Sequence, residues 1–212
     1  MERILFLQIL AGAAFVFSLL AFAGRLRAFN RLARPADRAV PKGSPRAGLI
    51  YAYTLGMAPW AKESTRLHTI AYLRGVAFHL GIFLGLGILL ASPWLGQLPP
   101  AWRSLLAIGA GLGALLGLAG FAARLLERNL KALSTPDDYA AVLAVSLFLA
   151  GASLWLFVPA ALPFFYLASA AMLVYAPFSK IRHCIYYAYS RMFFGKFVGI
   201  RAVLPHSQQG LR

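Results

Sequence analysis

Two histidines are the residues of this sequence most able to do chemistry. His79 lies in "RGVAFHLGIFLGLG" and His183 lies in "PFSKIRHCIYYAY". A histidine inside an apolar segment is costly in a bilayer and is therefore a candidate for a functional site. Two imidazoles on facing helices form the ligand set of haem b in a helical bundle. Taken singly, each has a simpler explanation: His79 could hydrogen-bond a carbonyl of a neighbouring helix, and His183 could be an ordinary residue at a span end.

The residues next to the two histidines support a cofactor site. Gly75 lies one turn before His79 on the same helical face, and it has no side chain that would block a porphyrin. Arg74, Lys180 and Arg182 carry the charge needed to pair with haem propionates, which must point toward water. We therefore expect these four residues to surround the cofactor.

The remaining histidines and the cysteine predict no further cofactor. His68 and His206 lie in basic, polar segments, where a solvated side chain is expected. Cys184 is the one cysteine of the chain, so the chain has no internal disulfide and no Cys-rich iron–sulfur or zinc site of its own.

The composition requires a bilayer around the elements that position these histidines. The chain has 212 residues, of which 60% are hydrophobic and 13% charged. A soluble domain of this length could not bury so much apolar surface. The sequence therefore predicts an all-α polytopic membrane protein that forms a single domain over residues 1–212. Its five transmembrane helices are expected at about 4–23, 73–91, 101–123, 139–158 and 163–186.

Two short stretches predict how the fourth span begins and ends. "STPDDY" is typical of a helix start, because Thr135 can cap the helix, Pro136 suits its first position, and Asp137 and Asp138 favour the positive end of its dipole. "VPAALP" predicts a tight turn between the fourth and fifth spans.

The positions of the basic residues predict the orientation of these spans. The loop 24–68 holds nine Lys and Arg residues, the loop 124–134 holds three, and the C-terminal region from Lys180 onward holds six. The opposite side holds only Arg3 and Arg103. The positive-inside rule then places the N-terminus outside and the C-terminus in the cytoplasm. We expect the protein in the inner (cytoplasmic) membrane of the cell. This distribution also explains the net charge of +15 without nucleic acid.

That topology places both histidines in the cytoplasmic half of the membrane. The second span begins in the cytoplasm and the fifth ends there, so the two are antiparallel and carry His79 and His183 at similar depth. All six acidic residues lie outside the apolar cores, which disfavours a proton-coupled transporter. The row Gly109, Gly113 and Gly117 in the third span predicts close approach of a neighbouring helix or of a flat ligand.

Several stretches together resemble one family of membrane cytochromes. "FHLGIFLGL", "PFSKIRHCIYY", "GMAPWAKESTRLH" and "STPDDY" resemble the gamma subunit (cytochrome b) family of respiratory nitrate reductase. They are closer still to the membrane subunits of sulfite-reductase-linked and heterodisulfide-reductase-like complexes. The resemblance implies that His79 and His183 ligate the haem nearer the cytoplasmic face. The ligand positions of the family's second haem are Leu89 and Phe165 here, and neither can bind iron, so we expect one haem b.

The resemblance also implies a function. It predicts an electron-transfer subunit of a quinone-linked oxidoreductase, in which a cytoplasmic iron–sulfur subunit carries the catalytic chemistry and this chain is not catalytic alone. The dense positive charge of the cytoplasmic segments is expected to dock that subunit, with attraction to anionic lipid as the alternative. The alternative function is a non-haem membrane anchor or scaffold for a complex.

A quinone site is expected near the cytoplasmic end of the second span. Glu63 and His68 precede that span and could exchange protons on the side where the haem is expected. The simpler interpretation is that Glu63 only begins a helix.

Overall fold

The chain is helical, and it contains five segments able to cross a membrane. The computed structural model describes residues 2–32 and 40–203, and these residues contain no strand. The predicted all-α fold with five segments long and apolar enough to cross a membrane is confirmed, whereas the orientation of the termini stays a prediction. These segments are α1 (Glu2–Asn30), α4 (Thr69–Leu95), α5 (Pro100–Leu126), α7 (Pro136–Phe157) and Pro159–Phe178, which contains α8 (Leu162–Tyr175).

The described residues form two compact units. The span unit contains residues 2–23 and 73–181, and the basic unit contains residues 24–32, 40–72 and 182–203. Compact units need not fold independently, so this division does not test the prediction of a single domain over residues 1–212.

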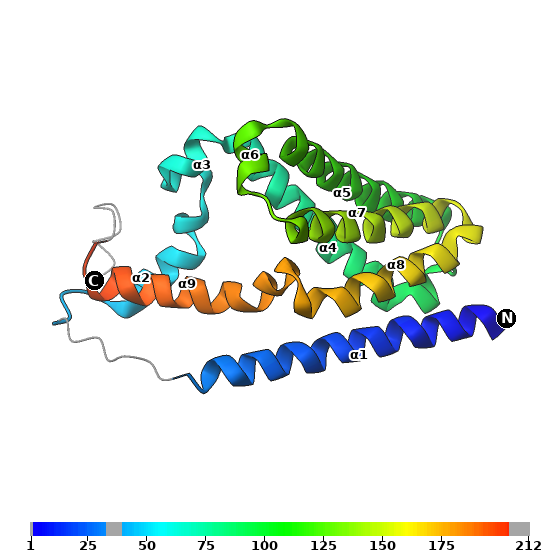
Figure 1. The fold of residues 1–212 in the computed structure, drawn as a ribbon, viewed down its shortest axis with the longest axis horizontal. Coiled ribbons are helices and arrows are strands. Elements are labelled where there is room, and N and C mark those ends of the chain that lie inside the picture. Colours follow the sequence, from blue (N-terminus) through cyan, green and yellow to red (C-terminus); the bar gives the residue numbers. More distant parts are fainter. Residues whose placement is uncertain (1, 33–39, 204–212) are drawn as a thin grey trace. The chain divides into compact units, whose positions relative to one another are not determined.

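Close packing of glycines holds the helices of the span unit together. Helix α7 packs against both α5 and α8, and Figure 1 shows α5 and α7 side by side. A Cβ on Gly81 of α4 would lie only 2.8 Å from the Cα of Gly113 of α5. A Cβ on Gly109 would lie 2.6 Å from Leu84 Cδ2. The glycine row of α5 therefore serves helix packing, the first of the two uses that its spacing predicts.

Helix α7 begins as its sequence predicts. Pro136 occupies the first turn, and Thr135 forms a capping box with Asp138. The Asp138 carboxylate accepts hydrogen bonds from the Thr135 backbone N–H at 2.7 Å and from its hydroxyl at 2.8 Å. At its other end α7 is joined to α8 by the single turn η3 (Pro159–Ala161), which confirms the tight turn expected from "VPAALP".

The fifth span ends earlier than its sequence predicts. Helix α8 stops at Tyr175 and is followed by the short turns η4 (Ala176–Phe178) and η5 (Lys180–Arg182), so no single helix covers 163–186. Pro177 has no N–H and cannot continue the helical hydrogen bonds. The backbone N–H of Lys180 instead donates to Asp137 Oδ2 at 2.9 Å. The chain therefore turns between Tyr175 and His183.

The basic unit is built on a pair of closely packed helices. Helix α2 (Pro45–Tyr53) packs against α9 (His183–Ile200). A Cβ on Gly195 would lie 2.8 Å from the Gly48 carbonyl oxygen, so the two backbones nearly touch. The backbone N–H groups of Lys42 and Gly43 donate to the Ile200 carbonyl at 2.7 and 3.0 Å. The unit also contains η1 (Leu55–Met57), η2 (Pro59–Ala61) and α3 (Glu63–Leu67), while α6 (Arg128–Leu133) belongs to the span unit.

Candidate haem-ligand residues and a membrane cavity

His79 is held in an orientation suited to metal binding. It lies in the apolar part of α4 with an exposed side chain, and its Nδ1 is 2.7 Å from the Gly75 carbonyl oxygen. A carbonyl oxygen can only accept, so Nδ1 of the neutral ring carries the proton and Nε2 carries the lone pair. A hydrogen bond of this kind fixes the ring and its tautomer in many metal-binding histidines.

The face of α4 around His79 is apolar and open. Val76, Leu80 and Phe83 are exposed on this face, Phe83 at 68%. A Cβ added to Gly75 would meet no heavy atom within 4 Å. His79 therefore lies on a surface of the span unit that a planar apolar molecule, a neighbouring helix or lipid could cover.

Arg74 lies on a different face of α4 from His79. The two residues are five positions apart, which separates their directions by about 140° at 3.6 residues per turn. A Cβ added to Gly120 of α5 would lie 3.8 Å from Arg74 Nε. The Arg74 guanidinium therefore packs toward α5 and not toward His79.

His183 is the first residue of α9, in the basic unit, whereas His79 belongs to the span unit. The His183 side chain is exposed, and so is that of Arg182, the last residue of η5. Of the three cations expected at haem propionates, Arg182 is thus the one adjacent in sequence to a candidate ligand and exposed to solvent.

Lys180 is engaged by an acidic pair that sequence reasoning treats only as a helix start. Its Nζ forms a 2.5 Å ion pair with Asp138 Oδ2. The neighbouring Asp137 accepts hydrogen bonds from the Lys180 backbone N–H and from the Tyr175 hydroxyl. We name Asp137 and Asp138 the acidic clamp, because they tie the start of α7 to the end of α8. The signal in the sequence is "DD" at a helix start together with a lysine just after the next span.

Glu63 and His68, the residues expected at a quinone site, flank the short helix α3. Glu63 is its first residue and His68 follows its last, and both side chains are exposed. Thr65 fixes this turn, since its hydroxyl donates to the Pro59 carbonyl at 2.7 Å. His206 lies outside the described residues.

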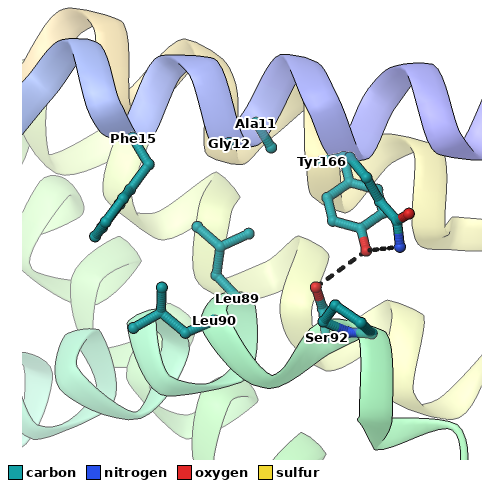
Figure 2. Close-up of a pocket in the computed structure, with 9 residues that line it drawn as sticks. Ala11, Gly12, Phe15, Leu89, Leu90, Ser92 and Tyr166 are labelled. Atoms are coloured by element: carbon teal, nitrogen blue, oxygen red, sulfur yellow. Dashed lines mark hydrogen bonds between the residues drawn. The ribbon is translucent and has the colours of Figure 1, made fainter.

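The span unit contains a cavity of about 200 Å³ whose walls come from α1, α4 and α8 (Figure 2). Three of its polar groups form one chain of hydrogen bonds. The Gln8 amide donates to the Tyr166 hydroxyl at 3.0 Å, and that hydroxyl donates to Ser92 Oγ at 3.0 Å. Tyr166 is 2% exposed, so this is a buried polar cluster within membrane-crossing helices. Gln8 is a site residue that the sequence-based predictions lack, although a glutamine within an apolar span is a usable signal.

Comparisons with known proteins identify no relative. No family model matches the chain, and neither the curated proteins nor the solved structures contain a match. The family resemblance therefore stays an expectation from the residues themselves.

Among the described residues, no group of three or more His, Cys, Asp or Glu side chains could hold a metal ion. A haem between two histidines needs no such group.

The basic unit combines positive charge with aromatic rings. Arg201 Cζ lies 3.8 Å from the centre of the Phe197 ring, while Lys62 Nζ and Arg191 Cζ each lie 5.5 Å from the centre of Phe194. Eleven of its described residues are Lys or Arg and one, Glu63, is acidic. Those cations are Arg25, Arg27, Arg31, Lys42, Arg46, Lys62, Arg66, Arg182, Arg191, Lys196 and Arg201.

Proposed function

We propose that this chain is a membrane-embedded electron-transfer subunit that holds one haem b through His79 and His183. In this proposal it passes electrons between quinone or quinol in the bilayer and a cytoplasmic iron–sulfur subunit. The observation that carries the proposal is the state of His79. Its imidazole lies on an open apolar face of a span, and its Nδ1 is hydrogen-bonded to the Gly75 carbonyl.

The residues present fit a bis-histidine haem. Nε2 of His79 carries a lone pair for iron, and Gly75 leaves room for a flat macrocycle beside the ring. The exposed guanidinium of Arg182 next to His183 is the best placed of the expected propionate partners, because Lys180 is paired with Asp138 and Arg74 packs toward α5. A bound haem would supply reversible one-electron transfer. The chain would supply the two ligands, the apolar cover and the charge near the carboxylates.

The packing of the span unit supports one haem and not two. Phe165 is 0% exposed, and its ring stacks on Trp155 at 5.3 Å and on Phe148 at 5.9 Å between ring centres. Leu89, the other position at which the resembled family has a second ligand, is 8% exposed and apolar. Neither side chain can ligate iron, and Phe165 is in addition closed in by aromatic rings.

The charge of the basic unit supports an acidic partner. Its cations outnumber its acids by far among the described residues, and complementary charge accelerates docking between protein subunits. In this proposal the partner is the iron–sulfur subunit, and anionic lipid is the competitor for the same surface.

Haem content tests the proposal. The purified chain should show a b-type α band in its reduced-minus-oxidised spectrum, and pyridine haemochrome should give one haem per chain. His79→Ala and His183→Ala should each lose most of this haem, whereas the control His68→Ala, an exposed histidine of the basic unit, should retain it. Full retention of haem in both ligand variants would overturn the proposal.

A non-haem membrane anchor is the second candidate, and the concentration of cations in the basic unit favours it equally. A featureless spectrum from a chain that still co-purifies with an acidic partner would establish this alternative.

A further inference from the structure

We propose that the cavity between α1, α4 and α8 binds the head group of a quinone-type molecule, a neutral six-membered ring with oxygen substituents and an apolar tail. The inference rests on the proposed function, which requires a redox partner that dissolves in the bilayer. It assigns that partner to the span unit and not to Glu63 and His68.

The size of the cavity fits one ring. An apolar protein cavity of about 150 Å³ accepts a benzene molecule. The present cavity of about 200 Å³ leaves additional room for ring substituents, but not for a macrocycle. Ala11 and Gly12 of α1 form one wall without bulky side chains, and Phe15 and Leu90 supply apolar surface (Figure 2).

The polar groups of the cavity can meet ring oxygens with both donors and acceptors. In the hydrogen-bonded chain from Gln8 through Tyr166 to Ser92, the Ser92 hydroxyl accepts a hydrogen bond from the Tyr166 hydroxyl. Its own proton can therefore be donated to a further acceptor. Gln8 uses one N–H toward Tyr166, and its amide has a second N–H and a carbonyl oxygen. A quinone carbonyl could therefore accept from this cluster, and a quinol hydroxyl could donate to it.

Pro93 removes the usual helical donor of one backbone carbonyl next to the cavity. It lies inside α4, and its missing N–H would otherwise donate to the carbonyl four residues earlier, that of Leu89. Leu89 and Pro93 both line the cavity. A ligand hydroxyl bound here could donate to that carbonyl, so a proline that weakens the helix at this point also serves recognition.

The absence of charge in the cavity limits the class of ligand, and the position of the cavity along α4 indicates the depth at which the ligand binds. None of its lining residues is charged, which favours a neutral ligand over a lipid phosphate. Leu89 follows His79 by ten residues on one helix, a separation of about 15 Å along α4. The ring would thus bind at a different depth from the histidine.

A matched pair of glycine substitutions tests the inference in the full-length chain, purified into lipid nanodiscs and titrated with decylubiquinone. A Cβ at Gly12 or at Gly87 would meet no heavy atom within 4 Å, but only Gly12 lines the cavity. Gly12→Phe should weaken binding by about tenfold or more, which is ~1.4 kcal/mol or more. Gly12→Leu should weaken it less, and Gly87→Phe should leave it unchanged. Tyr166→Phe should weaken binding about fivefold, because Gln8 and Ser92 lose the hydroxyl that orients them.

The outcomes separate this inference from the proposed function. Equal affinity in the Gly12 and Gly87 variants would overturn the inference, and so would displacement of the quinone by decanol at equal concentration, which would indicate an acyl-chain cleft. Haem content is measured in the same samples. Wild type that lacks haem but binds quinone with the expected variant pattern would refute the haem proposal and support the cavity assignment.

Discussion

The span unit and the basic unit join their helices by the same device but handle polar groups differently. Both bring helices together at glycines, Gly81 with Gly113 in one unit and Gly48 with Gly195 in the other. In the span unit five serines are buried, and Ser18, for example, donates to the Leu173 carbonyl. In the basic unit long cationic side chains lie over phenylalanine rings.

This difference follows from the solvent that each unit requires. In hydrocarbon a polar group must find its partner within the protein, and a short hydroxyl reaches a nearby carbonyl at little entropic cost. At a membrane surface, arginine and lysine can cover aromatic rings with their stems and keep their charge in water. Glycine contacts between helices therefore do not distinguish a hydrocarbon environment from an aqueous one, whereas the type of polar contact does.

The sharpest test of the comparison asks on which side of the membrane the basic unit lies. Cys184 of α9 is the one cysteine of the chain, so no substitution is needed. The positive-inside rule predicts no labelling by an impermeant maleimide in intact cells, and full labelling in inside-out vesicles. Labelling of intact cells would reverse the predicted orientation. A permeant maleimide provides the control for reactivity.

Substitution of leucine for glycine at one helix contact in each unit should destabilise that unit alone. Gly113→Leu should destabilise the span unit by about 1–3 kcal/mol or more, because the Gly81 Cα lies 3.1 Å from the added Cβ. Thermal unfolding in detergent should report a lower Tm. Gly195→Leu should instead leave the spans folded and expose the basic unit to limited proteolysis.

Gly96→Leu is the control for both changes, since its Cβ would meet no heavy atom within 4 Å. Equal proteolysis of the basic unit in the Gly113 and Gly195 variants would show that the two units unfold together.

The acidic clamp should contribute a smaller amount. Asp138→Ala removes the capping box of α7 and the ion pair with Lys180. The cap is worth about 1 kcal/mol. The Lys180 side chain is 48% exposed, so solvent screens the ion pair and it adds little. Calorimetry should show a modest loss of Tm, whereas Glu127→Gln, a change to an exposed carboxylate near the same end of α7, should show none. A loss as large as that of Gly113→Leu would contradict this ranking.

The smallest expected effect is kinetic. Cys184 is an exposed residue, but partial burial of its thiol raises the pKa of that thiol above its usual range. Only the thiolate reacts, so alkylation at neutral pH should be slower than for free cysteine. Its rate should keep rising to a higher pH than that of free cysteine. A rate profile that matches free cysteine would show that the thiol is fully hydrated.

The sequence predicted the features that depend on local physics. Apolar length gave the five membrane-crossing segments, and "STPDDY" gave the start of α7. It did not predict the end of α8. Pro177 is a local signal for that break, but the turn that follows is held by a hydrogen bond from the Lys180 backbone to Asp137, which lies more than forty residues away in the sequence. The cavity was missed for the same reason. Gln8, Ser92 and Tyr166 lie on three helices, and only their packing brings them into one hydrogen-bonded chain.

The acidic clamp has a consequence for biogenesis. Helices α7 and α8 are linked by one turn at one end, and at the other end the clamp joins Asp137 to Tyr175 and Lys180. The two helices therefore form a loop closed at both ends. If a translocon released α7 before α8 was made, the two adjacent carboxylates would lie at the bilayer surface without Lys180 as their partner. Insertion of the two helices as one hairpin would bring the two carboxylates and Lys180 to the same membrane face at the same time.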